Sequence, residues 1–103
     1  MHAELFDTLA DPSRRRILCL LLDGERSAGE LVEALQMSQP AVSKHLKVLR
    51  DRGFAEMRAD AQRRLYRLRP EPLAEIDAWL QPFRRYWANK LDNLERYLDE
   101  QGA

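Results

Sequence analysis

Residues 38–49, SQPAVSKHLKVL, constrain the fold more than any other part of the chain. Ser38 is a residue type that caps helix starts, and Pro40 is tolerated in a first turn, where backbone donors lack helical partners. The segment predicts a short helix over residues 38–51, closed by Gly53. Apolar residues spaced by four and then three positions form one stripe along this helix: Val42, Leu46 and Leu49.

The other face of this helix is small, polar and basic, and no acidic residue interrupts it before Asp51. A solvated helix face usually mixes charges of both signs, whereas a face that meets phosphates and base edges needs this composition. We expect Gln39 and Ser43 to reach base edges or phosphates and the lysines to reach phosphates. The candidate DNA-contacting residues on the helix are Gln39, Pro40, Ser43, Lys44, His45 and Lys47.

The charge distribution supports this expectation, although the 103-residue chain has no formal net charge. Residues 38–69 hold nine basic and three acidic side chains, while the segments on either side each carry a net charge of −3. A basic middle between acidic flanks makes an oriented patch, and orientation matters more than the total charge.

Further helices and a hairpin are predicted around the central helix. Short helices are expected over residues 4–10 and from Asp11-Pro12 to about Leu22. Ser27 and Glu30 form a capping box that starts another helix, and residues 36–37 connect it tightly to the central one. Helix, short turn, helix is the geometry of a helix-turn-helix.

Two-residue alternation follows Gly53 and predicts a β-hairpin, or wing, over residues 54–69 with its tip near residues 60–62. Basic side chains close to that tip are candidates for phosphate or minor-groove contact, because a basic helix lies next to them. The wing candidates are Arg58, Gln62, Arg63 and Arg64.

A long helix is predicted over about residues 72–99, with a kink at Pro82. Its apolar positions recur by threes and fours, close to a heptad pattern. A stripe of that length exceeds what one small domain can cover, so we expect a homodimer rather than an aromatic ligand pocket. The expected dimer contacts are Leu5, Phe6, Leu9, Leu80, Phe83, Trp87, Leu91 and Leu94.

Taken together, these elements predict one mainly α domain over residues 1–103, a winged helix-turn-helix with a small β-hairpin. The chain resembles the ArsR/SmtB family of bacterial repressors. The resemblance lies in residues 9–18 (LADPSRRRIL), 38–49, Gly53 and 64–68 (RLYRL). It implies a homodimer that represses transcription on a palindromic operator, with the helix at 38–51 in the major groove.

The chain departs from the metal-sensing members of that family. Where such members place cysteines, this chain has Ser27 and Gly29, and its last helix has aspartates but no histidine. We therefore expect no metal site, no cofactor and no evident small-molecule effector. Relatives often have glycine at the wing tip, where this chain has Ala61-Gln62, so the type of turn stays open.

Three further features have structural alternatives that we favour over functional ones. His45 sits beside the apolar stripe, where a half-buried structural histidine is favoured over a base reader. The arginines at 14–16 are expected to pair within the protein rather than with DNA. Cys19, in the apolar run at 17–22, is expected to be a buried small residue rather than a redox sensor.

Other classes of protein fit the sequence less well. A lone cysteine excludes an internal disulfide, and no apolar run is long enough to span a membrane. The start lacks a signal peptide, so the expected location is the cytoplasm. No catalytic constellation is present, which argues against an enzyme. A protein-interaction winged helix is the remaining alternative to a DNA-binding regulator, and it would usually lack the basic face.

Overall fold

The computed structural model describes residues 2–102, and the chain divides into two compact units. The first, residues 1–73, is called the winged unit below, and the second, residues 74–103, is the C-terminal unit. The winged unit contains every predicted DNA-contacting residue. Its helices are α1 (His2–Ala10), α2 (Pro12–Leu21), α3 (Ala28–Leu35) and α4 (Gln39–Asp51).

The helix starts follow the capping residues predicted from the sequence. Asp11 accepts from the backbone N–H groups of Ser13 and Arg14 at the start of α2. Ser27 and Glu30 make both hydrogen bonds of the capping box that begins α3. Ser38 accepts from the N–H of Ala41 at the start of α4. These caps satisfy donors that a helix start otherwise leaves unpaired, and they fix the ends of the helix-turn-helix.

The turn between α3 and α4 is tight because Gln36 adopts the left-handed conformation, with φ of 55°. Its N–H donates to the carbonyl of Val32, so the chain leaves α3 abruptly. An amide side chain tolerates this conformation better than a β-branched one. The structure therefore confirms the predicted helix-turn-helix geometry.

The sheet has one more strand than the predicted hairpin. The hairpin strands β2 (Ala55–Asp60) and β3 (Arg63–Leu68) pair antiparallel, as predicted. A two-residue strand, β1 (Arg26–Ser27), pairs with the other edge of β3, which gives the order β1-β3-β2. Ala61 has φ of 57° at the hairpin tip, so the turn takes a left-handed residue there without glycine.

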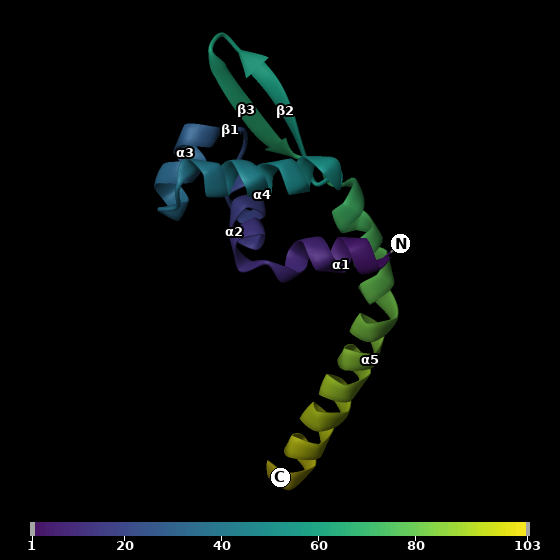
Figure 1. Ribbon diagram of the computed structural model, residues 1–103. Coiled ribbons are helices and arrows are strands. Elements are labelled where there is room, and N and C mark those ends of the chain that lie inside the picture. The colour runs from purple at the N-terminus through teal and green to yellow at the C-terminus, as the bar shows by residue number, and fades with distance from the viewer. Residues whose placement is uncertain (1, 103) are drawn as a thin grey trace. The chain divides into compact units, whose positions relative to one another are not determined.

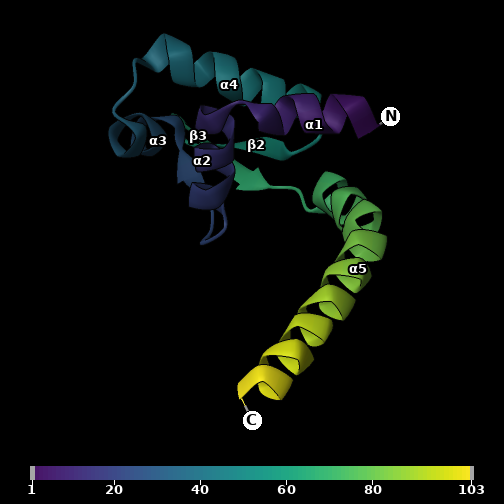
Figure 2. The same cartoon turned by 90° about the horizontal axis from the view of Figure 1, so that it is seen from below.

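The core of the winged unit lies where α2, α3, α4 and the base of the wing meet. Fully buried apolar side chains from each of these elements close it: Ile17, Leu31, Leu46, Leu49 and Phe54. Figures 1 and 2 both show α1 running beside α4, and Figure 1 shows the wing on the other side of α4. The buried stripe of α4 fixes which face of that helix is left for solvent.

Arginine side chains join α1 to the rest of the winged unit. Arg52, just after α4, donates to the carbonyl of Glu4 at 3.1 Å and to the hydroxyl of the fully buried Thr8 at 3.0 Å. Arg14 donates to the carbonyl of Thr8 at 2.7 Å, and Arg15 to that of Leu9 at 2.6 Å. For Arg14 and Arg15 the favoured structural role is confirmed, because they cap the end of α1.

One prediction about α2 is wrong, because Cys19 is exposed rather than buried. The apolar run places apolar side chains on every side of the second half of α2. Only the face with Ile17, Leu18 and Leu21 packs against the core. One residue rotates a helix by about 100°, so Cys19 turns away from that face. Leu22 is also 69% exposed.

The C-terminal unit consists of the main part of α5 (Glu71–Gly102), which begins at the end of the winged unit. The helix continues through Pro82, where the sequence predicts a kink, and extends a little beyond the predicted range of residues 72–99. Its large apolar side chains are exposed in the single chain, by 64% for Leu91 and 58% for Trp87. Within residues 2–102, none of the helices combines the length and the apolar character needed to cross a membrane.

Candidate nucleic-acid interface

An open groove of about 480 Å³ joins the recognition face of α4 to the wing. Gln39 and Ser43 line it from α4, the residues that begin α3 line it from a second side, and wing residues close it. The wing contributors are Gln62, Arg63, Arg64 and Tyr66. Five of the ten predicted DNA-contacting residues, which come from two separate segments of the sequence, therefore share one surface.

The exposed face of α4 carries the predicted lysines beside this groove. Lys44 is exposed and has no ion-pair partner among the described residues, whereas Lys47 pairs with Asp51 at 2.9 Å. That pair is 75% and 62% exposed at its two side chains, so it is weak and a phosphate can replace the carboxylate. Arg50 is exposed on the same face, and the prediction from sequence missed it. The spacing 43, 47, 50 was the signal that could have found it.

The wing tip presents two arginines on β3. Arg63 approaches Asp60 at 3.5 Å across the hairpin, a long and solvent-exposed contact. Arg64 is exposed and has no ion-pair partner in the part of the chain that the structure describes. A guanidinium on a protruding hairpin can bind phosphate oxygens bidentately.

Arg58 differs from the other wing candidates because it is already engaged within the protein. Its Nε and Nη2 donate to the two carboxylate oxygens of Glu25 at 2.7 and 2.9 Å. These hydrogen bonds lower the pKa of Glu25 below its ordinary value and raise the pKa of Arg58. The structure thus places Arg58 in an ion pair with Glu25.

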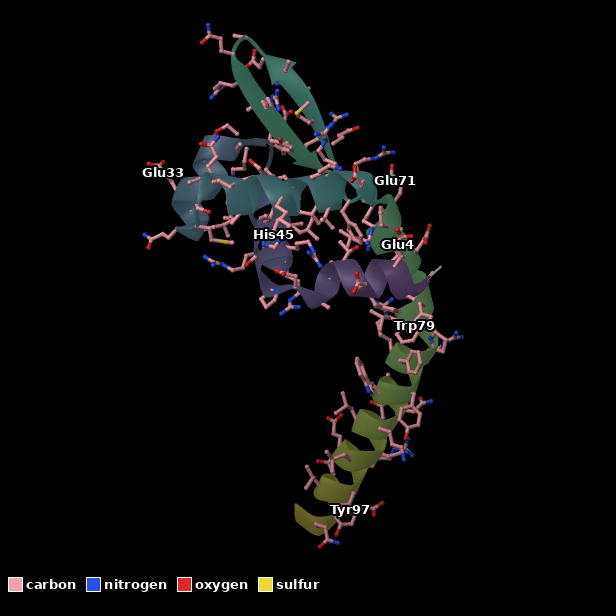
Figure 3. The ribbon with its side chains drawn as sticks, viewed as in Figure 1. Glu4, Glu33, His45, Glu71, Trp79 and Tyr97 are labelled. Carbon is pink, nitrogen blue, oxygen red and sulfur yellow. The ribbon has the colours of Figure 1, made fainter. Side chains whose placement is uncertain are left out.

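His45 lies away from the groove. It is two residues after Ser43 and so is rotated by roughly 160° around α4. Figure 3 shows it on the side of α4 away from the wing, and it is half-buried. Its Nδ1 is buried and has no hydrogen-bond partner within residues 2–102. These observations support the favoured structural role over base reading.

Asp11 is held ionised by the start of α2. Burial raises its pKa, but hydrogen bonds from the backbone N–H groups of Arg14 and Ser13 outweigh burial, and the pKa is lowered overall. The charge stabilises the cap most above the ordinary pKa of an aspartate and less as pH falls through the lowered value.

The expected dimer contacts divide between the two units. Leu5 is only 9% exposed and belongs to the core of the winged unit, so we remove it from the expected interface. Phe6 is 37% exposed and Leu9 half-buried. The α5 members other than Leu80 are all more than 40% exposed: Phe83, Trp87, Leu91 and Leu94.

Ser27 and Gly29, the positions compared above with the cysteines of metal-sensing members of the resembled family, carry no metal-binding side chain. The hydroxyl of Ser27 accepts from Glu30 N–H, and the Glu30 carboxylate accepts in turn from Ser27 N–H. These bonds lower the pKa of Glu30. Gly29 offers no side chain at all. Across residues 2–102, no three histidine, cysteine, aspartate or glutamate side chains lie together in a way that could hold a metal ion.

We predict that zinc, cadmium or arsenite does not release this protein from DNA. Soft metals need thiolate or imidazole ligands, and Ser27 and Gly29 supply neither. The measurement is fluorescence anisotropy of a bound duplex during titration with each metal. Release at stoichiometric metal, lost when a few residues are substituted, would contradict the prediction.

Comparisons with known proteins agree with the geometry. Residues 11–56 match the family described as bacterial regulatory protein, arsR family. The chain is 37% identical to the HTH-type transcriptional regulator Rv2034 of Mycobacterium tuberculosis, over 94% of this chain and 88% of that protein. It is 40% identical to the biofilm growth-associated repressor of Agrobacterium fabrum, over 72% of this chain but only 63% of that repressor.

Solved structures give the same result for the fold. Reduced HlyU from Vibrio cholerae aligns with a TM-score of 0.66 and 38% identity, covering 80% of this chain and 87% of HlyU. The homodimeric winged helix-turn-helix DNA-binding domain of Mb0332 from Mycobacterium bovis aligns with a TM-score of 0.66 and 31% identity, over 81% and 77%. The predicted winged helix-turn-helix is confirmed.

Proposed function

This chain belongs to the ArsR family of bacterial transcriptional regulators, and from that premise we propose that it is a homodimeric repressor that occupies a palindromic operator in the cytoplasm. The family is one of DNA-binding regulators rather than enzymes. The proposal adds the oligomeric state, the sign of regulation and the residues that contact DNA.

The observation that carries the proposal is the shared groove. Gln39 and Ser43 on α4 line it together with Gln62, Arg63 and Arg64 on the wing. A major groove admits one α-helix, and a wing beside that helix reaches the neighbouring phosphates or minor groove. We assign base contacts to Gln39 and Ser43, and packing at the helix start to Pro40. Phosphate contacts are assigned to Lys44, Lys47, Arg63 and Arg64.

The α5 stripe supports the dimer. Helical spacing places its apolar side chains on one side, and they are exposed in the single chain. An exposed apolar stripe of this size marks an interface, and a second copy offers the same stripe under two-fold symmetry. The Mb0332 domain, which aligns over most of this chain, is homodimeric.

The direct test selects binding sites from a random duplex pool and from genomic fragments, including the region upstream of the chain's own gene. We expect enrichment of imperfect palindromes whose half-sites lie about one helical turn apart. Enrichment of single, non-repeated sites would contradict the dimeric part of the proposal. Failure to enrich any duplex would instead favour a protein-interaction module.

We predict that Lys44→Gln and Lys47→Gln each weaken binding to operator and random DNA alike. Because phosphate contacts release counterions, each lost contact should flatten the plot of log affinity against log salt by about 0.9, and a dimer loses two. Arg96→Gln is the matched control, since it removes one exposed positive charge on α5. Equal slopes for wild type and both lysine variants would rule out phosphate contact.

A further inference from the structure

The wing is joined to the rest of the winged unit by little backbone pairing. β1 has only two residues, and its register with β3 consists of Arg26 opposite Tyr66 and Ser27 opposite Leu65. β2 lies on the far side of β3 from β1. A hairpin held at one short edge needs side-chain contacts to keep a fixed orientation.

The Glu25–Arg58 ion pair supplies such a contact across the whole width of the sheet. Arg58 on β2 and Ser27 on β1 both stand opposite Leu65 of β3, so they share one face with it. Glu25 lies two residues before Ser27 and therefore points to the same face. Its carboxylate meets the guanidinium of Arg58 with two hydrogen bonds, of 2.7 and 2.9 Å. The pair thus links β2 to the residue directly before β1, over the central strand β3.

A second ion pair extends this arrangement. Glu56 on β2 stands opposite Arg67 on β3, and the Arg67 side chain hydrogen-bonds to the Glu56 carboxylate. The positive charge of Arg67 also helps to lower the pKa of Glu25. Two carboxylates and two guanidiniums therefore neutralise one another on this face, in contrast to the unpaired Arg64 at the groove.

The segment that Glu25 belongs to leads directly into the helix-turn-helix. Ser27 is both the last residue of β1 and the cap of α3, and α3 continues through the tight turn into α4. A wing fixed to this segment is fixed to the start of the recognition motif. The pair is well placed to set the distance from the wing tip to Gln39 and Ser43 across the groove.

We propose that Glu25 and Arg58 are positioning residues for the DNA interface, which hold the wing so that Arg63 and Arg64 face the groove shared with α4. This rests on the proposed DNA-binding function. It replaces the phosphate contact predicted for Arg58 from the sequence with an indirect role. The Nε and Nη2 donors on one edge of the Arg58 guanidinium are used on Glu25, so Arg58 acts on DNA through the placement of the wing.

The test is a double-mutant cycle in the full-length protein with Glu25→Gln, Arg58→Gln and both together. We expect each single variant to weaken operator binding by about two- to fivefold, since the pair is partly exposed. The double variant should be no weaker than either single one. The swapped pair, Glu25→Arg with Arg58→Glu, should restore most of the affinity. The dependence of affinity on salt should match wild type for Arg58→Gln.

A direct phosphate contact by Arg58 would give the opposite pattern. Glu25→Gln would then free the guanidinium and tighten binding, and Arg58→Gln would flatten the salt dependence by about 0.9 per lost contact. Either result, or unchanged affinity in both single variants, would overturn the positioning role. Thermal unfolding of each variant identifies any that fail to fold. If a single variant does not fold, the affinity of the swapped pair decides whether the ion pair positions the wing.

A readout without DNA separates this proposal from the proposed function. We expect Glu25→Gln to speed amide hydrogen exchange at residues 26–27 and 65–66, where β1 meets β3. Unchanged exchange there would overturn the positioning role whatever the DNA data show. If the wild-type protein enriched no duplex, the proposed DNA-binding function would be wrong. The exchange result would still report whether the ion pair holds the wing.

Discussion

Leu91→Glu in the full-length protein is expected to abolish the homodimer and to weaken operator binding by about 10²- to 10⁴-fold. Leu91 is 64% exposed in the single chain and lies in the middle of the α5 stripe. A two-fold interface would bring two carboxylates into an apolar contact, where unpaired charge is costly. The large effect on DNA arises because only a dimer binds both half-sites at once. Sedimentation velocity measures the first effect and fluorescence anisotropy the second.

Asn89→Glu is the matched control for this prediction. Asn89 is two residues before Leu91 on the same helix, so it points to roughly the opposite side of α5. It is also exposed, and the substitution adds the same charge. We expect an intact dimer and unchanged affinity for Asn89→Glu. A dimer of Leu91→Glu that persists at micromolar concentration would show that the stripe is not the interface.

The sequence predicted the helix-turn-helix well because its signals are local. Caps at Asp11, Ser27 and Ser38 need only the next three residues to act, and each makes the predicted bonds. The apolar stripe of α4 fixes its buried face by periodicity alone. The signals for the hairpin are equally local, since its side chains alternate between two faces and its two strands follow one another in the sequence.

The features that sequence reasoning missed depend on residues far apart in the chain. β1 is two residues long and has no periodicity to detect, and it forms because β3 offers it an open edge. Cys19 was misplaced because an apolar run shows how much of a helix is apolar, but not which face meets the core. Arg52 was counted with the basic patch, yet it turns to α1 and contacts residues more than forty positions away.

The same distinction applies to the interface. Gln39 and Ser43 could be assigned from one helix, because their face is the complement of the buried stripe. Arg58 could not, because its partner Glu25 lies 33 residues earlier and meets it only after the sheet forms. Charge counting therefore overestimates the basic surface, since Arg52, Arg58 and Arg67 are all committed to partners within the protein.

Gln39→Ala and Ser43→Ala are expected to reduce sequence discrimination rather than general affinity for DNA. Both side chains are exposed and line the groove, so their removal should leave the fold intact. Each should cost about 1–3 kcal/mol on the selected operator, because a base contact carries sequence information. On random duplex DNA the cost should be much smaller, since there the helix binds mainly through phosphates. Affinities for both duplexes at several salt concentrations measure the difference.

Lys44→Gln provides the internal comparison, because Lys44 lies on the same exposed face of α4 as these two residues. It should lose affinity equally on operator and random DNA and flatten the salt dependence, while the Gln39 and Ser43 variants keep the wild-type slope. The two kinds of variant thus separate base reading from phosphate binding on a single helix. If Gln39→Ala and Ser43→Ala lost affinity equally on both duplexes, the face of α4 that enters the major groove would have to be reassigned. The neighbouring exposed residues Lys47 and Arg50 would then be the next to test, since they continue the same face toward the end of the helix.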